Sequence, residues 1–177
     1  MKKFGVFILI VILCSLIAGT YGMLHDQLTY TISPEYYTKF KFIRMNIDPA
    51  LAPRLAVCEI GFLSTWWAGI FAGVAIGAAG FIHRYSYEMR RYCLQGILLA
   101  LIVTFITGLI GLGYGFAFES TIPREQFSNL FIPEPLQNYN CFIAVATMHD
   151  FSYVGGAIGL LCGTAWQFLK RKKKKKN

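Results

Sequence analysis

The chain has 177 residues, of which 55% are hydrophobic and only 15% are charged, and its formal net charge at pH 7 is +8. A soluble domain usually carries about 25% charged residues, so this composition excludes an ordinary soluble globular protein. The positive charge is confined to a few places along the chain, which argues against a surface that binds nucleic acid.

Four stretches without Asp, Glu, Lys or Arg are long enough to cross a bilayer: residues 4–24, 61–82, 92–118 and 151–169. A spanning helix needs about 20 apolar residues. The chain is therefore predicted to be an all-α membrane protein with a single domain, 1–177, built as a four-helix bundle with ordered extracytoplasmic loops. The expected transmembrane spans are 4–24, 61–82, 94–116 and 150–169.

The basic residues predict the orientation of the bundle. Twelve of the 17 lie before the first span, between the second and third, or after the fourth, together with a single acid. This positive-inside pattern puts both termini in the cytoplasm and the loops 25–60 and 117–149 outside, which in a bacterium means the inner membrane. The basic tail, 170–177, is then an anchor attracted to anionic lipid, the alternative being a segment recognised by nucleic acid or a receptor.

The first span is expected to be an uncleaved helix. Met1, Lys2 and Lys3 resemble the start of a signal peptide, which is the alternative. The apolar run that follows is longer than the apolar part of a typical signal peptide, and it lacks a clear small-x-small cleavage site.

The first outer loop is predicted to contain a strand and a helix. Residues 28–33 alternate between apolar and polar side chains, which is typical of a short strand. Ser33 and Pro34 then indicate the start of a helix. Because its aromatic and basic side chains fall on different faces, we expect this helix to lie flat among the lipid headgroups. The first face holds Tyr36, Phe40 and Ile43, and the basic residues are Lys39, Lys41 and Arg44.

Glycine recurs at every fourth position in two of the spans, which predicts close helix–helix packing. We favour packing within one chain, the alternative being a face for a homo-oligomer or a protein partner. The glycines are Gly69, Gly73 and Gly77, and Gly155, Gly159 and Gly163.

Two of the five cysteines, Cys58 and Cys141, belong to the outer side. They form a disulfide if the compartment is oxidising, and otherwise they are two free thiols. The sequence leaves both readings open.

Two of the three histidines are followed directly by aspartate, although the chain has only three aspartates. His25-Asp26 ends the first apolar run, and His149-Asp150 begins the last one. Counted from the basic residues at the inner face, both histidines lie about 32 Å above it, at a rise of about 1.5 Å per residue. Since the first and last helices of a bundle are usually neighbours, the two pairs are expected to form one site.

This predicted site combines two neutral imidazoles with carboxylates, which is typical of a site for a divalent transition metal. The same groups suit a small polar ligand or acid–base chemistry. Alternatively, each His-Asp pair only satisfies backbone groups at a helix end and holds a loop in place. The metal candidates are His25, Asp26, Glu59, His149 and Asp150, with Gln27, Glu35 and Tyr36 as further site candidates.

The stretches 4–24, 61–82, 92–118 and 151–169 contain no Asp, Glu, Lys, Arg or His, which argues against a transporter coupled to ions or protons at the membrane centre. The third histidine, His83, lies among basic and aromatic residues of the inner side and is expected to fill space at the interface.

The segment Tyr21-Gly-Met-Leu-His-Asp-Gln-Leu-Thr-Tyr-Thr-Ile-Ser-Pro-Glu-Tyr-Tyr-Thr38 resembles a family of small, uncharacterised bacterial membrane proteins. Members carry a similar His-Asp-Gln-x-Thr…Glu-Tyr-Phe-Thr stretch after their first helix, and Tyr37 stands at the position of the Phe. The resemblance covers about a tenth of the chain. It implies a membrane location and draws attention to His25, Asp26, Gln27, Glu35 and Tyr36, but it implies no reaction.

Three functional hypotheses follow. The first is a small integral membrane protein whose outer polar site binds a metal or a small polar ligand. The second is a non-enzymatic scaffold or assembly subunit of a membrane complex, and the third is an enzyme that acts on lipid or envelope substrates. The distance between His25 and His149 is the most useful observation, because one ion can join two imidazoles only when their nitrogens are a few ångströms apart.

Overall fold

The computed structural model describes residues 2–48, 52–127 and 131–171, and within these ranges every regular element is helical. Four helices are long and apolar enough to cross a membrane, which confirms the predicted four-helix bundle. They are α1 (Lys3–Ile32), α4 (Pro53–Gly80), α5 (Ser86–Ala117) and α6 (Tyr139–Leu169). Residues 172–177 of the predicted basic tail lie outside the described residues.

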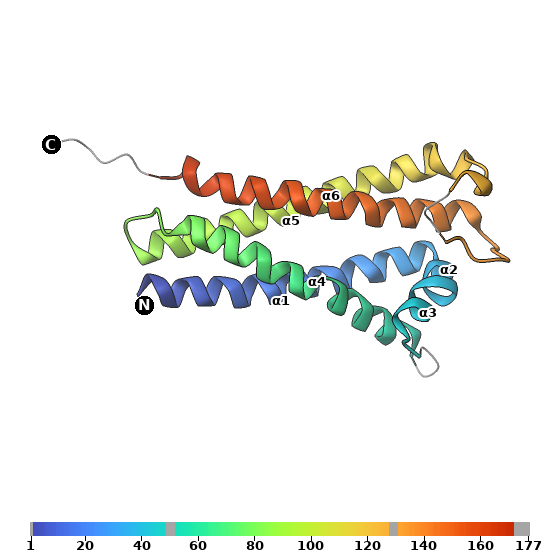
Figure 1. Ribbon diagram of the computed structural model, residues 1–177, viewed down its shortest axis with the longest axis horizontal. Coiled ribbons are helices and arrows are strands. Elements are labelled where there is room, and N and C mark those ends of the chain that lie inside the picture. The colour runs from blue at the N-terminus through green and yellow to red at the C-terminus, as the bar shows by residue number, and fades with distance from the viewer. Residues whose placement is uncertain (1, 49–51, 128–130, 172–177) are drawn as a thin grey trace.

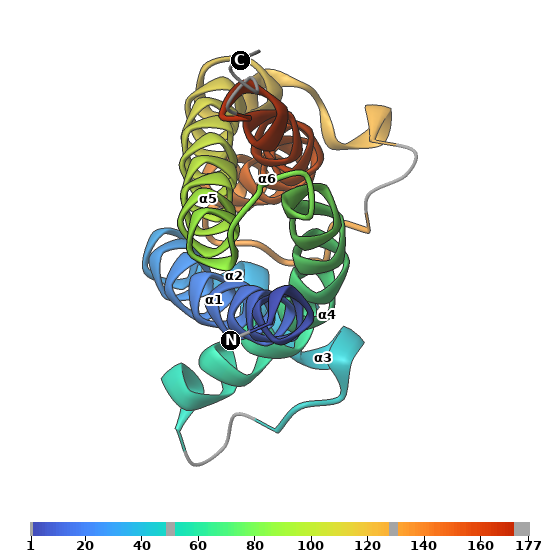
Figure 2. The same ribbon diagram turned by 90° about the vertical axis from the view of Figure 1, so that its left-hand side faces the viewer.

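The bundle consists of two helix pairs, with α1 packed along α4 and α5 packed along α6 (Figure 1). The start of α1, the end of α6 and the α4–α5 connection lie at one end, which we call the termini end. The segments that follow α1 and α5 lie at the other end, the loop end. Figure 2, viewed along the bundle, shows the four helices arranged around a common axis. The first and last helices are therefore not paired along their length, and α1 meets α6 only locally.

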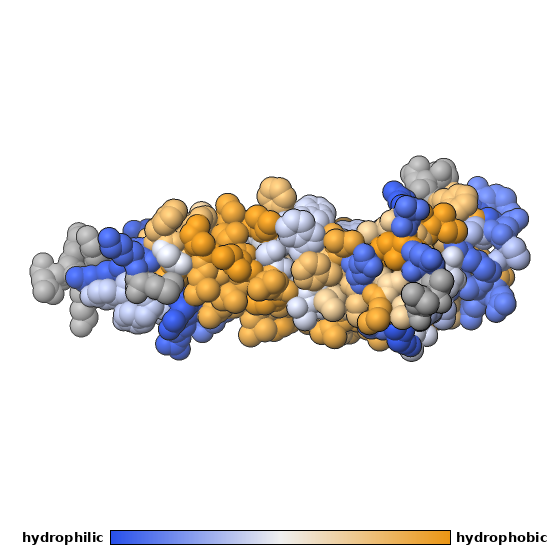
Figure 3. Space-filling model, turned by 90° about the horizontal axis from the view of Figure 1, so that it is seen from below, coloured by the Kyte–Doolittle hydropathy of each residue, from blue (hydrophilic) through white to orange (hydrophobic). Residues whose placement is uncertain are grey.

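The surface has the polarity that a bilayer requires. Apolar side chains cover the middle of the molecule, and hydrophilic residues gather at both ends (Figure 3). Large apolar side chains such as Phe71, Ile110 and Leu161 are exposed within this apolar belt. Because lipid solvates such side chains as well as a protein interior does, the protein is an integral membrane protein.

Close approach within each pair depends on glycine. A Cβ atom on Gly22 of α1 would lie 2.2 Å from the carbonyl oxygen of Gly61 on α4, and one on Gly96 of α5 would lie 2.7 Å from that of Gly163 on α6. No larger residue fits at such distances without moving the backbone. The repeated glycines of α4 face α1 and those of α6 face α5, so these faces are filled inside the chain, as we favoured.

The predicted strand at 28–33 is wrong, because α1 continues as a helix to Ile32. The hydroxyls of Thr29 and Thr31 donate to carbonyl groups one turn earlier, those of His25 and Gln27. A helix satisfies its backbone hydrogen bonds within itself, which an isolated strand at the membrane boundary cannot do. The fourth helix, α6, starts at Tyr139, well before the predicted span 150–169.

After α1, the short elements α2 (Pro34–Tyr36), η1 (Tyr37–Lys41, a π-helical turn) and α3 (Phe42–Met45) form one segment, which we call the outer segment. The predicted common face of Tyr36 and Ile43 is not observed. Tyr36, Tyr37 and Phe42 are buried in the apolar core at the loop end, whereas Ile43 is 72% exposed. The wider π-helical turn changes the angular position of the residues after it, so the predicted faces are wrong.

The connection between α5 and α6 contains two 3-10 turns, η2 (Glu119–Thr121) and η3 (Arg124–Gln126). Cys141, in the first turn of α6, and Cys58, on α4, are both free thiols, so the disulfide alternative is not present.

Glu35 connects the outer segment to the start of α6. Its carboxylate accepts hydrogen bonds from the backbone N–H groups of Gln137 and Asn138, at 2.8–3.0 Å, and from the Lys39 ammonium at 2.5 Å. Partial burial alone would raise the pKa of Glu35, but these donors hold it below its ordinary value. An anion beside the free N–H groups of a helix N-terminus is stabilising, so Glu35 holds the outer segment against α6.

We predict that Glu35→Gln loosens this connection at neutral pH, at a cost of about 1 kcal/mol, since it removes a charged acceptor at a helix N-terminus. Because the pKa of Glu35 is lowered in the folded protein, its contribution is complete above the ordinary glutamate pKa. It is lost as the pH falls through the lower, folded value. Hydrogen exchange at the Gln137 and Asn138 amides should accelerate in the variant. Glu59→Gln, at an exposed position of α4, is the control and should leave both rates unchanged.

Candidate functional site

The two histidines predicted to meet do so. His25, on α1, and His149, on α6, lie edge to face with their ring centroids 4.8 Å apart. Both side chains are buried, in the half of the bundle nearer the loop end. This is the local contact between α1 and α6, so the equal heights obtained by counting residues are matched in space.

Asp26 lies between the two rings and is 3% exposed. Its Oδ1 atom is 3.3 Å from His25 Nδ1 and 3.2 Å from His149 Nε2. Its Oδ2 atom accepts a hydrogen bond of 2.9 Å from the ammonium group of Lys41. A buried carboxylate needs such a counter-charge, because water no longer solvates it.

Lys41 is the residue that the sequence did not identify as part of the site. The last residue of the π-helical turn, it is buried, and its Nζ atom lies 2.9 Å from His149 Nε2 as well as from Asp26. The rings of Tyr36 and Tyr37 cover it, with their centroids 5.8 and 5.2 Å from Nζ. A buried aspartate needs a cation as a partner. Searching the residues that follow Asp26 for a nearby lysine or arginine would have pointed to Lys41.

Hydrogen-bond partners indicate the tautomer of each imidazole. His149 Nδ1 donates to the carbonyl oxygen of Val145 at 2.8 Å, and its Nε2 lies 2.9 Å from the Lys41 ammonium, from which a neutral ring accepts. In a neutral His25, Nδ1 donates to Asp26 and Nε2 accepts from the Ser152 hydroxyl at 3.2 Å. These contacts fit two neutral rings beside the Asp26 carboxylate and the Lys41 ammonium.

The Lys41 proton can occupy either of two positions. The 2.9 Å separation of Lys41 Nζ and His149 Nε2 is a hydrogen-bond distance, so one proton can move between them. Burial lowers the pKa of Lys41, although the neighbouring Asp26 carboxylate opposes this effect. Burial also raises the pKa of Tyr36 and Tyr37, so both remain neutral phenols beside the ammonium. We call His25, Asp26, Lys41, His149 and Ser152 the polar cluster.

Most of the other candidates lie elsewhere. Glu59, on α4, and Asp150, on α6, are both exposed and belong to no convergent set of ligand atoms among the described residues. Gln27 faces α4, where it donates to the carbonyl oxygen of Arg54 at 2.7 Å and to Cys58 Sγ at 3.1 Å. Only Tyr36, stacked on the His149 ring with centroids 5.0 Å apart, borders the cluster as expected.

His83 is buried at the termini end, where its Nε2 donates to Gln167 Oε1 at 3.1 Å and its ring packs on Tyr92. Lys3 donates to the carbonyl oxygens of Phe81 and His83 in the same connection. These contacts close the α4–α5 connection against α1 and α6, so His83 has a packing role.

The fit of a metal ion can be tested on the geometry. One ligand atom each from His25, Asp26 and His149 all lie within 4.8 Å of one another, which suits a single ion. However, the Lys41 ammonium already binds Asp26 Oδ2 and His149 Nε2. A metal ion at this place would have to displace the Lys41 ammonium from Asp26 and His149, which are two of the three candidate metal ligands.

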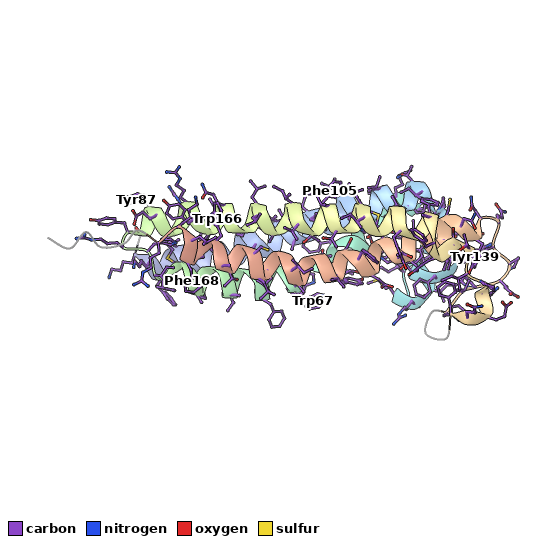
Figure 4. All side chains as sticks on the ribbon, turned by 90° about the horizontal axis from the view of Figure 1, so that it is seen from above. Trp67, Tyr87, Phe105, Tyr139, Trp166 and Phe168 are labelled. Carbon is purple, nitrogen blue, oxygen red and sulfur yellow. The ribbon has the colours of Figure 1, made fainter. Side chains whose placement is uncertain are left out.

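A cavity of about 530 Å³ adjoins the polar cluster and extends between the four helices toward the middle of the bundle. Most of its lining is apolar, and the cluster forms one end of it. Trp67 lines the cavity from α4, and Figure 4 shows this residue midway along the bundle. Tyr139 and Trp166, labelled in the same view, lie near opposite ends.

Comparison with protein-family models, with curated proteins and with solved structures found no match to this chain. Function is therefore inferred from the chemistry of the polar cluster and its cavity.

Proposed function

We propose that this protein binds a small ligand, or the polar part of a larger one, at the polar cluster on the extracytoplasmic side of a bacterial inner membrane. The distribution of basic residues supports cytoplasmic termini. The similarity of residues 21–38 to bacterial membrane proteins supports the compartment. The cluster then lies at the outer boundary of the membrane, facing the two outer connections.

One observation carries this proposal: a buried Asp–Lys pair and two imidazoles form the end wall of a cavity. Burying an ion pair usually costs as much free energy as the pair returns, so packing alone does not favour it over apolar residues. Ionisable groups within a membrane protein generally mark a binding or transfer site. The Lys41 ammonium, which has three N–H bonds and uses two of them within the cluster, keeps one for a ligand.

The test is whether the purified protein retains a bound ligand. We expect native mass spectrometry in mild detergent to find a discrete non-protein mass on the wild type. Asp26→Asn/Lys41→Met should lose it, because the variant no longer presents the charged pair. Glu59→Gln, at an exposed position outside the cluster, should keep it. Equal spectra for the wild type and the double variant would mean that the cluster serves only to hold the outer segment in place.

A divalent transition metal is the second candidate ligand, favoured by the convergence of His25, Asp26 and His149. Elemental analysis of the same samples distinguishes it. A resident metal should be lost in His25→Ala/His149→Ala. Negligible and equal metal in the wild type and this variant would exclude the metal and leave the small polar ligand.

A further inference from the structure

The lining of the cavity divides into a polar end and an apolar remainder. Of the described residues that line it, only Asp26 and Lys41 are ordinarily charged, and both belong to the polar cluster. Small residues from all four helices, such as Ala18, Ala68, Ala100 and Gly156, keep the remainder open. A volume of about 530 Å³ lies within the range of about 300–1,000 Å³ that is common for ligand pockets. An occupant that fills the whole space must be polar at one end and apolar along the rest.

The cavity opens toward the lipid rather than toward the ends of the bundle. Its exposed lining residues all come from α4 and α6, and the large ones are Trp67, Phe71 and Tyr153, which are 51%, 67% and 62% exposed. These two helices belong to different pairs, and the gap between pairs is less tightly packed than the gap within a pair. A ligand can therefore enter sideways, from within the bilayer.

The charge of the cluster favours an uncharged headgroup. Asp26 and Lys41 neutralise each other, and the hydrogen bonds of both histidines fit neutral rings. A headgroup with a full charge would be buried without a counter-charge of its own, which is costly in an apolar surrounding.

The groups left over in the cavity wall are hydrogen-bond donors. The Tyr21 hydroxyl is buried near Ser152, but it makes no hydrogen bond of acceptable geometry within the described residues. The Lys41 ammonium has three N–H bonds and uses two of them, on Asp26 and His149. By contrast, Thr65 and Thr104 donate to backbone carbonyl groups. A headgroup that satisfies the remaining donors must present acceptor atoms, as carbonyl oxygens do.

We infer that the ligand is a membrane-soluble amphiphile with a neutral, carbonyl-bearing headgroup of the quinone type. It enters between α4 and α6, its carbonyl oxygen accepts from Tyr21 and Lys41, and its tail lies along the apolar lining. This inference rests on the proposed function, because it requires the polar cluster to be a binding site, and it adds the class of ligand and the route.

The probe is a fully substituted benzoquinone with a decyl tail, added to the full chain in phosphatidylcholine nanodiscs. Quinones quench indole fluorescence, and Trp67 lines the cavity, so saturable quenching reports binding. We expect decanoate, whose alkyl chain is one carbon shorter and whose headgroup is charged, not to compete. We expect the same quinone without its tail to bind at least tenfold more weakly.

Two glycines provide a matched pair of variants. A Cβ atom at Gly156 of α6 or at Gly113 of α5 meets no other atom within 4 Å, so both positions have open space for a side chain. Only Gly156 lines the cavity. Gly156→Leu should therefore weaken quinone binding at least tenfold, whereas Gly113→Leu should leave it unchanged. Tyr21→Phe, which removes one donor, should weaken binding about fivefold.

The outcomes separate this inference from the proposed function. Equal, unsaturable quenching in the wild type and Gly156→Leu would mean partitioning into lipid and would overturn the inference. If the mass retained by the wild type also persists in Gly156→Leu, the polar cluster binds a small ligand, and the inference that the ligand is an amphiphile is wrong. Competition by decanoate would overturn the neutral headgroup. If neither a retained mass nor saturable quenching is found, both proposals fail.

Discussion

Replacing Lys41 with methionine should lower the free energy of unfolding by about 3–5 kcal/mol, because it leaves the buried Asp26 carboxylate without its counter-charge. Methionine keeps the length and apolar stem of the side chain. The variant also deprives His149 Nε2 of the donor that lies 2.9 Å away. Unfolding in mixed micelles of mild detergent and dodecyl sulfate, followed by circular dichroism, measures the loss.

Two further variants separate the buried charge from side-chain packing. Asp26→Asn/Lys41→Met removes both charges, and the new amide can donate to His149 Nε2, which lies 3.2 Å from Asp26 Oδ1. Most of the stability should return. Lys39→Met removes a cation whose side chain is 31% exposed, and it should cost less than about 1 kcal/mol. A Lys41→Met protein as stable as the wild type would contradict an ionised Asp26.

The same substitution at two positions of α5 should have opposite effects. Gly96→Ala should destabilise the protein by about 1–3 kcal/mol, because the added carbon would lie 2.7 Å from the Gly163 carbonyl oxygen and force α5 and α6 apart. Gly113→Ala adds the same carbon where nothing lies within 4 Å, so it should be neutral or slightly stabilising. The unfolding measurement described for Lys41 applies to both. Equal effects would show that the backbone contact between Gly96 and Gly163 is not close in the membrane.

The spans could be predicted from the length and apolar character of four stretches, and the common height of His25 and His149 from their distance to the charged ends. A helix rises by a fixed amount per residue, so counting from the charged ends gives the height of each side chain. Counting does not give direction around the helix axis. Asp150 is adjacent to His149 in sequence, but it is exposed, and Glu59 is exposed on α4. Height therefore identified the layer of the site but not all of its members.

Lys41 could not be predicted because its position depends on the π-helical turn and on the tyrosine rings that bury it. A regular helix drawn from the sequence assigns this lysine to the polar face. The strand expected at 28–33 failed for a related reason, since the backbone of α1 continues the hydrogen-bond pattern established in the membrane. In both cases tertiary context overrode a local pattern.

The positions of the cluster residues along the chain give the site an order of assembly during synthesis. Asp26 emerges with the first helix, and Lys41 follows 15 residues later, so this ion pair can form early. His149 comes 108 residues after Lys41, on α6. The histidine pair therefore exists only once α6 has been inserted, whereas a nascent chain released before α6 contains the ion pair without its second imidazole. The cluster thus distinguishes a finished bundle from an interrupted one.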